Sequence, residues 1–128
     1  MDKISEINYS EPLTYLFEPN SAILKSGGFQ QITNQLDVFK LHQHSHLYTS
    51  ENLIDFPGRI FKIESISSYD KKQLKKIKKA NITTRNFPKS VSDIRKETKI
   101  KDGGNVYLFF TKNMEEKLIV IHCEQIFQ

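Results

Sequence analysis

Apolar positions in the first half of the chain predict short elements separated by turn residues. Every second position from 13 to 17 is apolar, which suits a short strand that ends at Glu18-Pro19. A helix over 22–24, capped by Asn20 or Ser21, and a second one over 29–36 are expected next. Pro57-Gly58 is the clearest break in the chain, so we expect a boundary between two modules there.

The second half has a more regular pattern. Residues 59–67 alternate as a strand does, and Asp70 is placed to cap a helix over 71–79. A strand over 81–84 is followed by Ser90 and Asp93, which resemble a capping box for a helix to about Lys99. Residues 106–111 and 118–123 are apolar on both faces and predict two central strands. The order β-α-β-α-β-β places helices over one sheet, an α+β architecture.

Composition fits a soluble globular domain. Of the 128 residues, 38% are hydrophobic and 27% are charged. The longest apolar run, 118–121, is far shorter than the roughly 20 residues of a transmembrane helix. No secretory signal is visible, and Cys123 is the single cysteine. We therefore expect a cytoplasmic protein with no membrane partner.

Charge is distributed unevenly along the sequence. Residues 70–104 carry twelve Lys/Arg and four Asp/Glu, a balance of +8. Residues 1–69 have five basic and eight acidic side chains, which is −3, and residues 105–128 have two and three, which is −1, so the sum is the net charge of +4. A mildly acidic body with one basic segment is the pattern expected when one face meets a polyanion.

Four lysines in the predicted 71–79 helix share one face. Lys72, Lys75, Lys76 and Lys79 have the spacing i, i+3, i+4, i+7, and their like charges repel by roughly 0.2–0.5 kcal/mol per i,i+4 pair. A phosphate backbone would relieve that repulsion and release counterions. The competing interpretation is a solvated face that only aids solubility.

The second helix and the loop before it add further candidates. Arg95, Lys96 and Lys99 gather on the outer side of that helix. Arg85 and Asn86 lie in the preceding loop, where a guanidinium can hold phosphate or pair with a carboxylate. Phe87 either packs into the core or stacks on an unpaired base.

Motifs for catalysis are missing. The glycine pairs 27-28 and 103-104 do not lie between an apolar strand and a helix, so no cofactor-binding turn is present. His42, His44 and His46 would share one face of a strand, a spacing that could bind a metal, but no fourth ligand is near in sequence. We expect no catalytic residue, no metal and no cofactor within this chain.

Several ordered strings resemble one family over residues 11–127. The strings are YLFEPN at 15–20, AILK at 22–25, HLYTS at 46–50, FPGRIF at 56–61, NITTRNFP at 81–88 and IKDGG at 100–104. They are similar to the C-terminal region of class I SAM-dependent methyltransferases of Bacteroidetes, which consists of a ferredoxin-like domain followed by a THUMP-like domain.

The resemblance implies an α+β fold of two small α/β-sandwich modules. Residues 1–10 would be a linker or disordered, 11–56 a ferredoxin-like module, and 57–128 a THUMP-like domain of the order β-α-β-α-β-β. It also implies a catalytic domain that is absent from this chain and would bind SAM. That domain would be a partner in cis or in trans.

We therefore expect a non-catalytic region that recognises RNA, either tRNA or rRNA, for a bacterial RNA-modifying methyltransferase. A structural or docking module for the methyltransferase or another protein is the main alternative, and DNA binding shares the electrostatics. An intact enzyme is the least favoured interpretation. The residues expected to contact RNA are Lys72, Lys75, Lys76, Lys79, Arg85, Asn86, Arg95, Lys96 and Lys99.

Overall fold

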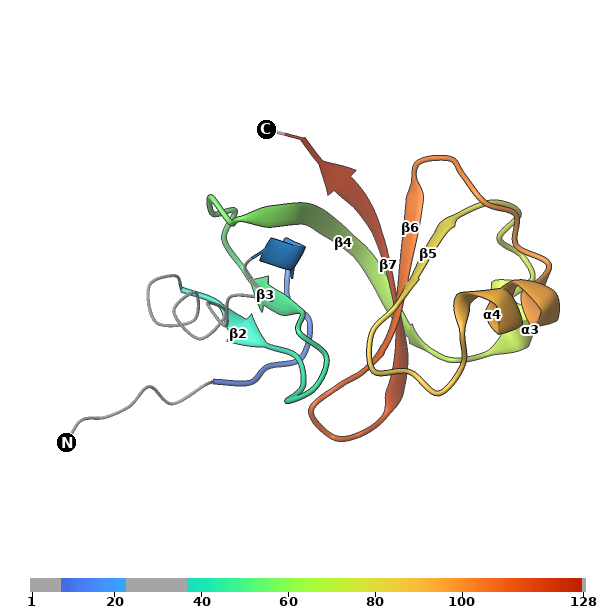
Figure 1. Ribbon diagram of the computed structural model, residues 1–128, viewed down its shortest axis with the longest axis horizontal. Helices are drawn as coiled ribbons and strands as arrows, with labels where there is room; N and C mark the ends of the chain where they lie inside the picture. Colours follow the sequence, from blue (N-terminus) through green and yellow to red (C-terminus); the bar gives the residue numbers. More distant parts are fainter. Residues whose placement is uncertain (1–7, 23–36, 128) are drawn as a thin grey trace.

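A computed structural model of the chain describes residues 8–22 and 37–127. Within these ranges seven strands form one mixed sheet in the order β2-β3-β1-β4-β7-β6-β5. Figure 1 shows the first three strands at one end of the molecule and the helices α3 and α4 side by side at the other. The α+β class predicted from the sequence is confirmed.

The first part of the sheet is built from short antiparallel strands. β1 (Tyr15–Pro19) pairs with β3 (Tyr48–Ser50), which in turn pairs with β2 (Phe39–Lys40). The predicted strand at 13–17 is therefore present but includes Glu18 and Pro19. The helix predicted over 29–36, and most of the one over 22–24, lie outside the described residues.

Strand β4 (Gly58–Ser68) joins the two parts of the sheet. Its first five residues pair with β1, and from Ile60 onward it pairs with β7. A register shift between Ile63 and Ser65 bends the strand, because a bulge adds local twist. β4 and β7 therefore arch across the molecule in Figure 1 and carry one sheet through both expected modules.

The second part follows the predicted order of elements. It comprises α3 (Lys71–Leu74), β5 (Asn81–Thr84), α4 (Val91–Thr98), β6 (Val106–Lys112) and β7 (Leu118–Ile126). β5 runs parallel to β6, whereas β7 is antiparallel to both β6 and β4. β6 and β7 are internal strands, as their two-sided apolar sequences predicted. Neither described helix has the length and apolar character needed to cross a membrane.

Buried residues on the two faces of the sheet belong to separate clusters. On one face Leu108 and Phe110 pack under the helices against Leu74 and Ile94. On the other face Phe109 joins a cluster with Phe61, Ile121 and two residues of the first part, Leu41 and Leu47. A third cluster, around Phe17 and Tyr48, also includes Ile60 of β4. Two of the three clusters therefore extend across the break at Pro57-Gly58.

Candidate nucleic-acid interface

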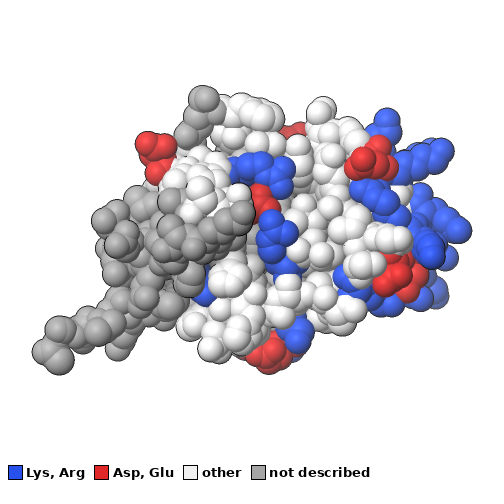
Figure 2. All heavy atoms as spheres, viewed as in Figure 1, with Lys and Arg blue, Asp and Glu red and all other residues white. Residues whose placement is uncertain are grey.

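Exposed lysines gather where α3 and α4 meet. In Figure 2 the Lys and Arg side chains crowd the end of the molecule that carries these helices in Figure 1, with a few acidic residues among them. We call this surface the basic end. Its members are exposed and form no ion pair with any described residue; they are Lys71, Lys72, Lys75, Lys76, Lys78, Lys79, Lys96, Lys99 and Lys101.

The helix predicted over 71–79 is much shorter in the structure. Asp70 caps it as expected, since its carboxylate accepts a hydrogen bond from the Lys72 amide at 2.9 Å. The helix ends at Leu74, and the chain then tightens, with the amides of Lys76 and Ile77 bonded to carbonyls three residues earlier. The expectation that four lysines share one helix face was therefore wrong.

Pairing with a distant segment explains why the helix stops. Residue 79 forms a parallel bridge with residue 101. The Ala80 amide donates to the Lys101 carbonyl at 2.9 Å, and the Lys101 amide donates to the Lys78 carbonyl at 2.9 Å. These bonds need extended backbone, and they relieve the i,i+4 lysine repulsion that a longer helix would impose. They also bring Lys78 and Lys101, which the sequence pattern did not select, into the basic end.

Helix α4 supplies the remaining lysines. Its capping signal is real, because the Ser90 hydroxyl accepts from the Asp93 amide at 3.1 Å. The helix ends at Thr98, and Lys99 has a left-handed backbone with φ of 66°. Lys96 and Lys99 thus lie near the negative end of the helix dipole, which favours cations even when no ligand is bound.

Arg95, one of the residues expected to contact RNA, makes several contacts within the chain. Its guanidinium donates to the carbonyls of Ile100 at 3.0 Å and Ala80 at 3.1 Å. It also pairs with Asp102 at 3.0 Å, and its side chain is only 23% exposed. Arg95 therefore fastens α4 to the residue before β5 and to the segment that follows α4, and few of its donors are left for a phosphate.

Arg85 and Asn86 lie away from the basic end. They follow β5, whereas Lys79 precedes it, so the length of that strand separates them. Arg85 pairs with Glu18, the carboxylate alternative considered for it. Arg59 stands opposite Glu18 in the β1–β4 register and donates from Nε to the same carboxylate at 2.6 Å. One buried carboxylate therefore holds two arginines from different parts of the chain.

A hollow of about 530 Å³ opens beside this Arg59–Glu18–Arg85 trio. Gly58 permits the close approach of the strands at its wall, because a Cβ there would lie 2.0 Å from the Glu18 carbonyl oxygen. The lining residues come from the end of β1, the start of β4 and the turn after β5: Glu18, Pro19, Asn20, Ser21, Gly58, Arg59 and Arg85.

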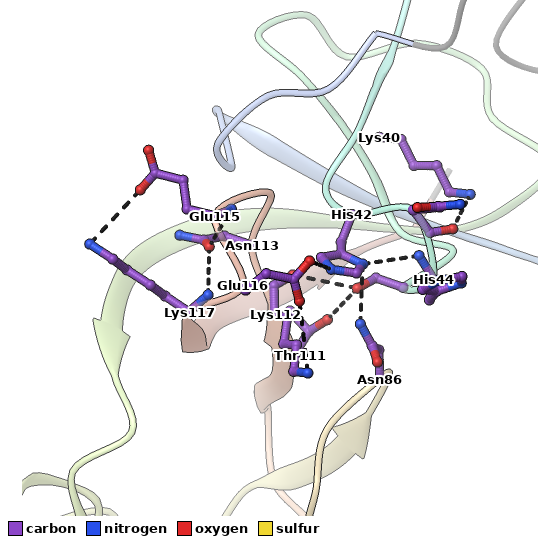
Figure 3. A network of polar contacts seen from close by, with 12 residues as sticks. Lys40, His42, His44, Asn86, Thr111, Lys112, Asn113, Glu115, Glu116 and Lys117 are labelled. Atoms are coloured by element: carbon purple, nitrogen blue, oxygen red, sulfur yellow. Dashed lines mark hydrogen bonds and ion pairs between the residues drawn. The ribbon is translucent and has the colours of Figure 1, made fainter.

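Asn86 takes part in a separate polar network, shown in Figure 3. Its amide contacts His42 Nδ1 at 3.2 Å, and the same nitrogen accepts from the His44 amide at 3.0 Å. Nδ1 therefore carries no proton, so Nε2 donates to Glu116 at 2.8 Å. His42 precedes a turn rather than lying on a strand with His44 and His46, so the expected common face of three imidazoles was wrong.

Phe87 packs into the core beneath the loop. Its ring makes edge contacts with Tyr69 and Phe110, each with centroids 5.5 Å apart. The Phe87 ring is part of the cluster under the helices. Of the two interpretations left open by the sequence, the structure supports the core position.

Comparisons with known proteins agree with the strings quoted above. Residues 15–57 match the family model of a ferredoxin-like domain, and residues 58–125 match that of a THUMP-like domain. A crystal structure described as a "putative methyltransferase" from Porphyromonas gingivalis W83 has a TM-score of 0.89 and 35% sequence identity. The match covers 96% of this chain but only 32% of that protein, so the chain spans about a third of its length. None of the curated proteins matches the chain.

The resemblance predicted from the sequence is therefore confirmed at the level of the family. The THUMP-like match alone covers more than half of the chain, from the start of β4 almost to the end of β7. The ferredoxin-like match ends directly before it. This chain belongs to the THUMP-like domain family and carries a ferredoxin-like domain before the THUMP-like one.

Proposed function

We propose that this chain is a non-catalytic RNA-binding region that presents tRNA or rRNA to a SAM-dependent methyltransferase domain. The observation that carries the proposal is the basic end, where nine exposed lysines lie together without carboxylate partners among the described residues. A phosphate backbone supplies the missing negative charge and releases counterions when it binds. Contacts of this kind position RNA without reading its sequence.

The backbone beneath the lysines is held in a defined shape. Asp70 caps α3, and Lys78 and Ala80 are hydrogen-bonded to Lys101. The aliphatic stem of Lys79 lies against the turn at Gly104, where a Cβ would be 3.2 Å from its Cδ. An ordered array of ammonium groups loses less freedom on binding than a flexible tail does.

Family membership also supports a role in RNA binding. THUMP domains bind RNA, and the similar Porphyromonas gingivalis protein is described as a methyltransferase, with about two thirds of its length outside the match. We propose that a catalytic domain carrying SAM acts with this region, in cis or in trans, in the bacterial cytoplasm. The present chain would then contribute affinity for the substrate and no catalytic residue.

A pair of double variants with equal charge change tests the proposal. Lys75→Gln/Lys76→Gln removes two charges from the basic end, and Lys62→Gln/Lys117→Gln removes two exposed charges elsewhere. Binding of total tRNA is measured by fluorescence anisotropy at several salt concentrations. We expect the first variant to reduce the slope of log K against log salt by about 1.4, since each phosphate contact on single-stranded RNA contributes about 0.7. The second should leave the slope nearly unchanged.

Three results would count against this function. Absence of tRNA binding at low salt, equal losses in both variants, or binding that does not respond to salt would each contradict it. Co-purification with a methyltransferase domain without any RNA shift would favour the docking alternative. Preference for duplex DNA over folded RNA in competition would favour a DNA-binding module instead.

A further inference from the structure

Three of the strings that carry the family resemblance meet at the hollow beside the arginine trio. Glu18 belongs to the string at 15–20, Arg59 to that at 56–61, and Arg85 to that at 81–88. The structure joins them through two ion pairs on one carboxylate. This convergence lies away from the basic end, which carries the function proposed above.

Arg59 is held firmly yet keeps its terminal donors free. Only its Nε bonds to Glu18, and its two terminal nitrogens have no hydrogen-bond partner among the described residues. Its side chain is 42% exposed. The guanidinium carbon lies 5.3 Å from the centre of the Phe61 ring and 5.7 Å from that of Tyr107, so both rings are within cation–π distance.

Charge at the hollow favours an anion. Two guanidinium groups share one carboxylate, which leaves one positive charge uncompensated within the trio. A guanidinium presents paired donors that match two oxygens of a phosphate or carboxylate. The volume of about 530 Å³ lies within the range of small-ligand sites, so the hollow can hold more than an isolated ion.

We propose that this hollow binds the phosphate of an unpaired nucleotide of the RNA, through the terminal nitrogens of Arg59. The inference rests on the proposed function, which makes RNA the partner. The Arg59 guanidinium lies near the Phe61 and Tyr107 rings, and a guanidinium plane of this kind can also stack on an unpaired base. Glu18 and Arg85 act as positioning residues that keep the Arg59 fork in place.

The test compares uridine 5′-monophosphate with uridine as probes of the full chain. Binding is followed by calorimetry and by the ¹⁵N-detected Nε–H signal of Arg59. Arg59→Lys keeps the charge but loses the planar guanidinium with its paired donors, so we expect about tenfold weaker binding of the monophosphate. Lys62→Arg, on the same strand β4, is the matched control and should bind as the parent chain does. Thermal unfolding of each variant verifies that the fold is retained.

Binding of the monophosphate but not of uridine, lost in Arg59→Lys and kept in Lys62→Arg, is the expected result. Equal binding of uridine, no binding of either probe, or an affinity that Arg59→Lys leaves unchanged would overturn the inference. If acetate competes for the hollow as strongly as the monophosphate does, the hollow would instead bind a carboxylate of a protein partner. That result would also overturn the inference.

The two proposals fail separately. Lys75→Gln/Lys76→Gln should weaken tRNA binding while the affinity for the monophosphate stays the same. Loss of all tRNA binding in the parent chain contradicts the proposed function. If the chain binds tRNA but does not bind the monophosphate, only the proposed nucleotide site is contradicted.

Discussion

Tyr69 donates a hydrogen bond to Glu97 at 2.8 Å and so ties the end of β4 to the last turn of α4. Lys89 reaches the other oxygen of that carboxylate at 2.7 Å. The hydrogen bonds from Lys89 and then Tyr69 lower the pKa of Glu97. Burial, with the hydrogen bond to Glu97, raises the pKa of Tyr69 to about 12.

These two shifts predict how stability depends on pH. Because the pKa of Glu97 is lowered in the folded chain, its carboxylate stabilises the fold above pH 4.5, the pKa in the unfolded chain. This stabilisation is lost as the pH falls through the pKa of the folded chain. Because the pKa of Tyr69 is raised in the folded chain, its protonated hydroxyl stabilises the fold below pH 10, the pKa in the unfolded chain. This stabilisation is lost as the pH rises towards 12. The difference in Tm between the parent chain and Tyr69→Phe should therefore narrow at both extremes. Circular dichroism melts across this pH range measure it, and a constant difference would contradict the coupling.

Arg95 and Lys96 are neighbours in sequence with opposite expected roles. Arg95→Gln removes hydrogen bonds to the carbonyls of Ile100 and Ala80, each worth about 1.5–3 kcal/mol for a charged donor, so we expect a loss of about 3–6 kcal/mol. Lys96→Gln has the same charge change at an exposed position and should cost less than about 0.5 kcal/mol. Urea unfolding gives both values. The affinity for tRNA, measured by fluorescence anisotropy, should change in the reverse order, with the larger loss in Lys96→Gln.

Gly58 should tolerate no side chain. A Cβ would lie 2.0 Å from the Glu18 carbonyl oxygen, which is backbone and cannot move without opening the β1–β4 pairing. We expect Gly58→Ala to cost about 2–4 kcal/mol in unfolding free energy, well above the usual effect of a surface change. Ser67→Ala on the exposed part of β4 serves as the control. Similar stability of the two variants would show that the strands can separate at little cost.

Loss of either helix cap should have a measurable and local effect. Asp70→Ala and Ser90→Ala each remove the acceptor for an amide in the first turn, and each should cost about 1 kcal/mol. Amide hydrogen exchange should accelerate at Lys72 in the first variant and at Asp93 in the second. Ser92→Ala, exposed on α4, provides the comparison. Unchanged exchange at both amides would contradict the caps.

Cys123 should be inert in the folded chain. The thiol is fully buried, and burial raises its pKa to about 12, so the thiolate needed for alkylation is scarce near neutral pH. We expect iodoacetamide to label it only as fast as the chain unfolds, and quickly in guanidinium chloride. Labelling of the native chain at the rate of a free thiol would show that β7 opens locally.

Local sequence patterns predicted which helices and strands are present better than they predicted where each of them ends. The two strands that are apolar on both faces, at 106–111 and 118–123, are β6 and β7, although β7 continues to Ile126. The caps at Asp70 and Ser90 were also readable, because each depends on residues two or three positions apart. The end of α3 depends instead on Lys101, a partner far along the chain, and no local pattern contains it.

The same distinction applies to the surroundings of the candidate site residues. The exposure of most lysines of the basic end follows from the local density of charge in the sequence. The roles of Arg85 and Arg95 depend on Glu18 and on the carbonyls of Ala80 and Ile100, which the fold brings to them. Arg59 belongs to one of the strings that resemble the family, but the sequence did not predict its role. That role depends on the β1–β4 register, which places Glu18 opposite Arg59 and leaves the terminal nitrogens of Arg59 free.

The shared sheet has a consequence for how the chain unfolds. The two family matches meet at Pro57-Gly58, yet β1 pairs with β4 across that point, and Leu41 and Leu47 share a core with Phe109. Only the cluster under the helices lies within one half, whereas the other two clusters combine residues of both halves, so the boundary between families is not a boundary between cooperative units. Both should melt in one transition, and a destabilising mutation in either half would lower the population of the whole folded chain.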